Sequence, residues 1–321
     1  MGVSRPGSAM TGGSNRPCPP FKVPGGAASE RRVEGGPMIR IVTDTGANLP
    51  RSIIDEFGIV MVTGHIIFGD EIIAEYPDLP AAEFYRRLTA AKTLPTNRDS
   101  TAQDFKNAYR RALDESPGAS ILSLHVSEAL AVTIGMARLA AASFPLVDIR
   151  VFDTRSVTLG QGLMVYEAAR MARDGADMDA IMRRLEDMRS RMRLYLTVDT
   201  LEYLSRGGRV GRAARVMGGL LNVKPILTIR GGMVQSHSQQ RSRARAIAAL
   251  RDLALEGCAG ADDLRLGIMH AVCEADARRL ADELQGKLQP ETLLIAEIGA
   301  AVGVHTGPGA LGVCWYAPEE N

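Results

Sequence analysis

The chain has 321 residues, of which 45% are hydrophobic and 23% charged, and its formal net charge is +1. These values are ordinary for a globular protein, and the length suits two domains of about 100–200 residues each. A nearly neutral chain offers no overall field for nucleic acid, and its apolar runs are interrupted too often to span a bilayer. The four cysteines form no C-x-x-C pair, so we expect reduced thiols, no metal site and a cytoplasmic location.

Residues 1–37 differ in composition from the rest of the chain. They are rich in Gly, Pro, Ser and Arg and lack apolar periodicity, which predicts a disordered extension. From residue 38 to 192, short apolar runs alternate with helical patterns. The expected strands are 39–43, 59–68, 121–126 and 149–152. The expected helices are 50–57, 128–142, 156–175 and 178–192, and a further helix is expected to begin at a capping-box pattern at 100–103. This alternation predicts an α/β domain with a Rossmann-like parallel sheet flanked by helices.

Residues 193–321 predict a second domain with a mixed α/β fold. The expected strands are 195–198, 226–229, 233–237, 266–270, 293–298 and 311–316, and the expected helices are 200–221, 242–255 and 274–288. Arg230-Gly231-Gly232 predicts a hairpin turn, because paired glycines accept positive φ. We expect a ligand to bind between the two domains.

A glycine-rich segment at 303–312 carries His305 beside Thr306 and lies between the last two expected strands. Glycine lets backbone approach a ligand closely, and an imidazole beside a hydroxyl suits an anionic oxygen. Hydroxyls also follow earlier strands, at Thr96, at Ser127 and at 154–156. Each alone is a typical helix cap, but together with His305 they predict an anion site at one sheet edge.

Two motifs are misleading. Residues 307–312 match G-x-G-x-x-G, but a strand follows and the chain ends soon after, which leaves no room for a dinucleotide-binding unit. Residues 44–47 read D-T-G-A, but an aspartic protease needs a second such aspartate, and none occurs. The remaining four histidines have unrelated spacings, and we interpret them as structural.

A cluster of arginines follows residue 201. Arg206, Arg212 and Arg215 fit a solvated helix face, whereas Arg209 directly follows two glycines and is the better candidate for contact with a partner.

Several ordered motifs resemble the DegV family of bacterial fatty-acid-binding proteins, over residues 39–316. The resemblance rests on the segments 41–45, 95–96, 127–133, 152–156, 198–204, 207–209, 220–227 and 305–312. It departs from the family pattern at 97–99 and 128–132. We expect Glu128, in the second departure, to point outward or to pair with Arg98.

The resemblance implies a lipid-binding protein that is not catalytic alone and needs no cofactor beyond its bound ligand. A long-chain fatty acid would place its carboxylate at Thr96, Ser127, His305 and Thr306. A separate ATP-binding kinase subunit would then phosphorylate it for phospholipid synthesis, with Arg209 at the partner contact. The resemblance also allows peripheral membrane contact during lipid exchange.

Two alternatives remain open. In the first, the fold is similar to that of the substrate subunit of dihydroxyacetone kinases, which binds a small ketone covalently through a histidine. His305 of this chain would then bind such a ketone or take part in phosphotransfer. A regulatory protein acting through the face 206–215 would bind partners with no ligand present.

Overall fold

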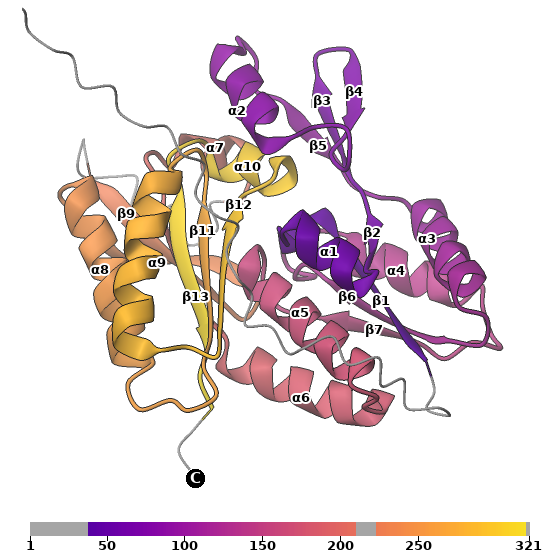
Figure 1. Ribbon diagram of the computed structural model, residues 1–321. Coiled ribbons are helices and arrows are strands. Elements are labelled where there is room, and N and C mark those ends of the chain that lie inside the picture. The colour runs from indigo at the N-terminus through magenta and orange to yellow at the C-terminus, as the bar shows by residue number, and fades with distance from the viewer. Residues whose placement is uncertain (1–37, 210–222, 319–321) are drawn as a thin grey trace, which may run out of the picture. The chain divides into compact units, whose positions relative to one another are not determined.

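The computed structural model describes residues 38–209 and 223–318 (Figure 1). The segment predicted to be disordered, together with Arg212 and Arg215, lies outside these ranges. The described residues belong to one compact unit. They form an α/β fold, as the alternation of patterns predicts.

The first sheet has four parallel strands in the order β2-β1-β6-β7. Its strands are β1 (Ile39–Asp44), β2 (Val60–Val62), β6 (Ser120–His125) and β7 (Ile149–Asp153). Its connections carry the 3-10 turn η1 (Thr45–Ala47), α1 (Arg51–Phe57), α3 (Ala102–Glu115) and α4 (Thr133–Ala141). Buried apolar strands joined by helices are typical of a parallel sheet with both faces covered.

The second sheet has six strands in the order β10-β9-β8-β13-β11-β12 and is mixed, since only β11 and β12 run parallel. Its strands are β8 (Arg193–Thr197), β9 (Lys224–Arg230), β10 (Met233–Gln240), β11 (Arg265–His270), β12 (Thr292–Glu297) and β13 (Leu311–Tyr316). The helices α8 (Arg243–Gly257) and α9 (Glu274–Leu288) pack side by side on it (Figure 1).

Two helices connect the sheets in sequence, α5 (Leu159–Arg173) and α6 (Met178–Arg191). The first eleven residues of α5 are buried all round, because this helix packs against β1 of the first sheet and β11 of the second. One apolar core therefore includes residues of both sheets. The predicted domain division between residues 192 and 193 stays a prediction.

A third sheet is not predicted from the sequence. The antiparallel strands β3 (His65–Phe68), β4 (Glu71–Ala74) and β5 (Thr96–Arg98) form it, with α2 (Ala81–Ala90) between the last two. The expected strand 59–68 is broken at 63–64, because its second half turns away to pair in this sheet. Two short helices, α7 (Glu202–Arg206) and α10 (Ala300–Thr306), contact each other, and α10 also contacts α2, β3 and β5.

Several helices begin later in the chain than the local patterns predict. The capping box before α3 uses Thr101 and Asp104, one residue later than the predicted box. The helix α4 begins at Thr133 rather than at residue 128, and Thr158 rather than Ser156 stands at the N-cap of α5. His305 lies in the last turn of α10, where an irregular glycine-rich loop was expected. Within the described ranges, no helix is both long enough and apolar enough to cross a membrane.

Candidate functional site

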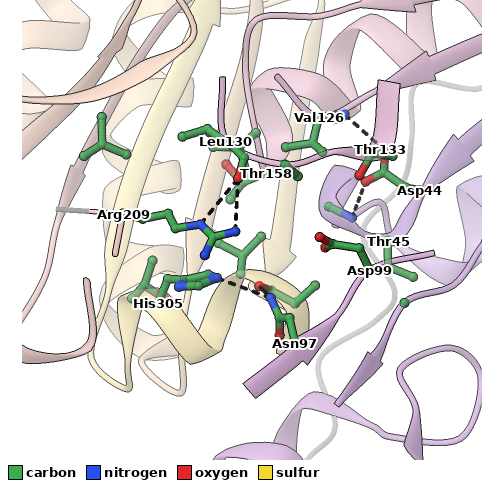
Figure 2. A pocket seen from close by; sticks show the side chains of 18 of the residues that line it. Asp44, Thr45, Asn97, Asp99, Val126, Leu130, Thr133, Thr158, Arg209 and His305 are labelled. Carbon is green, nitrogen blue, oxygen red and sulfur yellow. Dashed lines mark hydrogen bonds between the residues drawn. The ribbon is translucent and has the colours of Figure 1, made fainter. Parts of the chain in front are cut away.

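A cavity of about 140 Å³ lies where the three sheets meet α7 and α10. Its lining combines a mostly apolar surface with thirteen polar or charged residues, two of them the carboxylates Asp44 and Asp99. The apolar lining residues are Val126, Leu130, Ala131, Val157, Leu194, Leu196, Leu204, Leu227, Ile229, Val234, Ala301 and Val302. In Figure 2, Arg209, His305 and Asn97 gather on one side of this cavity, and Asp44, Thr45 and Thr133 lie on the other.

His305 lines the cavity, as does Thr306 beside it. Burial, together with the positive charge of Arg209, lowers the pKa of His305 to about 4. The imidazole is therefore neutral at pH 7. A Cβ on Gly207 would lie 2.1 Å from its Nδ1, so only glycine leaves room for this ring.

Asn97 brings an amide to the same side. Its Nδ2 donates to the carbonyl of Ala301 at 2.7 Å and lies 3.3 Å from Nε2 of His305. If Nε2 accepts from the amide, the ring proton sits on Nδ1. Among the described residues neither His305 Nδ1 nor Asn97 Oδ1 has a partner. A buried donor and a buried acceptor without partners are groups that a bound ligand would satisfy.

Arg209 points into the cavity (Figure 2). Its Nη1 donates to the carbonyl of Gly207 at 2.9 Å, while its Nε and Nη2 reach the carbonyl of Leu130 only at 3.4 and 3.3 Å. Two weakly held donors of a half-buried guanidinium can turn to an anionic ligand, because a charge-assisted bond is stronger than these long contacts.

Two predicted carboxylate ligands lie elsewhere. Thr96 is exposed on β5 and does not line the cavity, whereas Asn97, Arg98 and Asp99 after it do. Ser127 is 1% exposed and does not line the cavity, and its Oγ lies 2.3 Å from where a Cβ of Gly232 would stand. The turn between β9 and β10 thus covers this hydroxyl.

Both departures from the family pattern contribute to the cavity lining, the first through Asn97, Arg98 and Asp99 and the second through Leu130 and Ala131. Glu128 is exposed and pairs with Arg138 at 3.0 Å, and not with Arg98.

A buried polar network lies behind the opposite side of the cavity. Nδ1 of His125 lies 2.9 Å from Oδ2 of Asp44, and its Nε2 lies 2.6 Å from Oγ of Ser123, which accepts from the hydroxyl of Tyr109 at 2.9 Å. The order Asp–His–Ser is that of a hydrolase triad. However, His125 and Ser123 are both fully buried and neither lines the cavity, so no substrate can reach the hydroxyl. His125, interpreted from the sequence as structural, holds Asp44 in place.

Glu75 is not among the residues predicted from the sequence, and it fixes the helix that carries His305. It accepts from the hydroxyl of Thr45 and, at 2.8 Å, from the backbone N–H of Ala301 in the first turn of α10. Burial raises the pKa of Glu75, and the nearby carboxylate of Asp44 adds to this shift. Nothing in the residues around Glu75 signals this role, since its partners are 30 and 226 positions away. The part of the chain that the structure describes contains no group of three or more residues suited to hold a metal ion.

Comparisons with known proteins agree with this architecture. The family model described as "Uncharacterised protein, DegV family" matches residues 38–318. A DegV domain-containing protein of Deinococcus radiodurans is 34% identical over 86% of this chain and 97% of its own length.

Two solved structures share the fold. One is a fatty-acid-binding DegV family protein from Thermus thermophilus, with 31% identity, a TM-score of 0.82, and coverage of 88% of this chain and 100% of that one. The other is the fatty-acid-binding protein DegV of Bacillus subtilis, with 28% identity, a TM-score of 0.80, and coverage of 88% and 100%. Since the family model spans nearly all of the described residues and these structures share the fold, the chain belongs to the DegV family.

Proposed function

We propose that this protein binds a long-chain fatty acid in the cavity and presents it to a separate ATP-binding kinase subunit, which forms the acyl-phosphate. The observation that carries the first step is an apolar cavity with Asn97, Arg209 and His305 gathered on one side. The two solved relatives described above are themselves fatty-acid-binding proteins. The kinase step rests on the family resemblance alone.

The apolar lining suits the acyl chain. Each CH₂ removed from water contributes about 0.8 kcal/mol, so the tail supplies most of the affinity. Leucines from both β8 and β9 line the cavity, namely Leu194, Leu196 and Leu227, together with Ile229 and Val234 from the β9–β10 hairpin.

The polar side suits a carboxylate. Taking a carboxylate out of water is costly unless donors replace the lost solvent. Arg209 supplies a permanent positive charge, and the neutral imidazole of His305 lines the cavity beside it. We assign the carboxylate to Arg209 and Thr306, with Asn97 and His305 as the polar wall beside them. Thr96 and Ser127 form the competing set of ligands, and their roles stay predictions.

Lipid content tests the assignment. Protein purified after expression is extracted, and its fatty acids are quantified by mass spectrometry for the variants Arg209→Gln and Asn97→Ala. Losing a charge-assisted bond costs about 1.5–3 kcal/mol, so Arg209→Gln should retain fatty acid at least about tenfold more weakly. Asn97→Ala should weaken retention several-fold.

Thr96→Ala is the matched control, because Thr96 is the exposed neighbour of Asn97 on the same short strand. Loss of lipid in Thr96→Ala with retention in Asn97→Ala would transfer the headgroup site to the hydroxyl set. A small covalent adduct on His305, with no fatty acid in the extract, would favour the dihydroxyacetone-kinase-like alternative instead.

The presenting role has its own measurement. Protein loaded with a fatty acid is mixed with a fatty acid kinase subunit and labelled ATP, and acyl-phosphate is followed. Turnover that requires both proteins supports the proposal, whereas turnover by this chain alone contradicts it. If Arg209 serves the kinase contact rather than the ligand, Arg209→Gln will keep its lipid and lose turnover.

A further inference from the structure

A second concave site adjoins the cavity at β8 and β9. It is a polar cleft of about 530 Å³, which we call the arginine cleft, and its charged lining residues are Arg155, Arg189, Arg193, Arg230 and Glu186. This size falls within the range of about 300–1,000 Å³ typical of small-molecule sites. The loop after β7, the end of α6, the start of β8 and the β9–β10 turn all contribute to it.

The arginine cleft has a large excess of positive charge. Glu186 pairs with Arg189, which leaves the other three guanidinium groups without a carboxylate partner among residues 38–209 and 223–318. Arg193 donates only to the backbone carbonyls of Ser190 and Met192, at 3.3 and 3.2 Å. Uncompensated charges of one sign in a concave surface focus the field and attract anions.

The arginines come from fixed backbone positions. The amide of Arg155 donates to Oδ1 of Asp153 at 2.9 Å, and its φ of 48° places it in the left-handed region. Arg189 donates from Nη1 to the carbonyl of the same Asp153 at 3.1 Å. Arg230 ends β9, where it pairs with Met233 across the turn. Backbone constraints at these positions reduce the cost of ordering the side chains around a ligand.

A buried hydroxyl adds a second feature. Ser156 lines the arginine cleft, is 3% exposed, and its Oγ has no partner within the described part of the chain. This Oγ lies against Gly160 of α5, so the arginines and not this hydroxyl carry the site. Ser156 was expected from the sequence as a helix cap, but Thr158 stands at that position.

We propose that the arginine cleft binds a phosphate-bearing small molecule, with its phosphate among Arg155, Arg193 and Arg230. Phosphate offers three oxygens and nearly two charges, which match several guanidinium forks better than a single carboxylate does. Tyr195, the aromatic residue in the lining, is already stacked on Trp315, so the cleft offers no free ring for a nucleobase. A phosphomonoester or a phospholipid headgroup fits this chemistry better than a nucleotide.

This site is separate from the fatty acid cavity. None of its arginines lines the cavity, although Leu194, Thr228 and Ile229 line both. The proposal therefore does not depend on the proposed function, and lipid extraction of the same variants separates the two. We expect fatty acid content to be unchanged when the arginine cleft is altered.

The test is titration of the purified full chain with inorganic phosphate at constant ionic strength, followed by calorimetry. The cleft variant is Arg155→Gln/Arg230→Gln, which removes two exposed charges without touching the core. Its matched control is Arg110→Gln/Arg245→Gln, since both residues are exposed arginines on α3 and α8 that do not line the cleft. Phosphate should bind the wild type and the control equally, and the cleft variant at least about tenfold more weakly.

Absence of phosphate binding to the wild type overturns the proposal. Equal weakening in both double variants also overturns it, because net charge and not the cleft would then be responsible. Co-sedimentation with vesicles of phosphatidylcholine containing phosphatidic acid distinguishes the two sources of phosphate. If the protein binds these vesicles, phosphate displaces it from them, and the cleft variant does not bind them, the ligand is a lipid headgroup. If the protein binds phosphate but not the vesicles, the ligand is a free phosphate compound.

Discussion

Glu75 shows how one buried acid can link a distant strand pair to the candidate site. Its carboxyl group joins Thr45, next to the first sheet, to the first turn of the helix that ends in Thr306, one residue after His305. Burial and the nearby Asp44 favour its protonated form, so the pKa of Glu75 is raised in the folded protein. The position of His305 therefore depends on a residue that carries no recognisable motif.

The raised pKa makes a prediction about stability and pH. The folded state holds the proton of Glu75 at pH values where the unfolded state has lost it, so Glu75 lowers the free energy of unfolding as the pH rises above its ordinary pKa of 4.5. Glu75→Gln keeps an acceptor for Ala301 and cannot ionise. Urea unfolding between about pH 5 and 8 should therefore show a flatter stability profile for Glu75→Gln than for the wild type.

Glu71→Gln is the control, because Glu71 is exposed and its bond to Arg87 lowers the pKa of this carboxyl. The prediction is wrong if the profiles of Glu75→Gln and the wild type run parallel, or if Glu71→Gln flattens the profile as much.

The β9–β10 hairpin contributes residues to both concave sites. Its apolar residues line the cavity, Arg230 lines the arginine cleft, and its turn covers Ser127. Both turn residues have positive φ, 57° for Gly231 and 78° for Gly232, but only Gly232 is crowded. Substitutions at the two glycines can therefore distinguish the cost of backbone strain alone from the cost of strain plus a steric clash.

Alanine substitution should show this difference. Gly231→Ala meets no atom within 4 Å, so its cost should be the left-handed strain of about 1–2 kcal/mol. Gly232→Ala adds a contact 2.3 Å from Oγ of Ser127, which should raise the cost by about 1–3 kcal/mol and increase amide exchange in the hairpin. Chemical unfolding and hydrogen exchange measure both effects. Equal losses of stability in the two variants would show that the turn does not press on Ser127.

At the scale of the whole molecule, a buried ion-pair network joins α5 to the second sheet. Glu167 of α5 is 1% exposed and Arg265 of β11 is 2% exposed, and they approach to 3.5 Å. Arg170 and Arg184 also bind Glu167, both at 3.0 Å. Burial acts to raise the pKa of Glu167, but the bond from Arg170 and the charges of Arg265 and Arg184 outweigh it, so this pKa is lowered.

Removing the buried carboxylate should destabilise the protein. Glu167→Gln removes the carboxylate that Arg170, Arg184 and Arg265 share, while Arg265 keeps Asp263 and Glu291 at 2.6 and 2.7 Å, so the expected cost is about 1–3 kcal/mol. The contribution of Glu167 is present above its ordinary pKa of 4.5 and is lost as the pH falls through the lowered value. The control is Glu291→Gln, which removes the half-exposed partner of Arg265 and should lower the free energy of unfolding by about 1 kcal/mol or less. Thermal and urea unfolding at pH 7 measure the stability of both variants. Similar costs for the two variants would contradict a network built on Glu167.

The sequence alone determined the fold class and most of the helices and strands, and it singled out His305 and Thr306, which line the cavity and whose role as ligands stays a prediction. Apolar periodicity carries this information because it reflects which face of each element is buried, and the caps Asp177 and Ser242 mark two helix starts by their own side chains. It also indicated strand ends as the region of the site. These are properties of local stretches, so they can be read without knowing what packs against them.

The tertiary structure decided which side chains face the cavity. Thr96 and Asn97 are neighbours on β5, and pairing with β3 turns the amide inward and the hydroxyl outward. A shift of one residue in the strand pairing would turn each side chain to the opposite face of the sheet. The sequence near residue 96 does not contain the partner strand that fixes this pairing. Arg209 turns inward and Ser127 is covered for the same reason, since segments far away in the chain supply their surroundings. Direction and access depend on long-range pairing, which local sequence patterns do not encode.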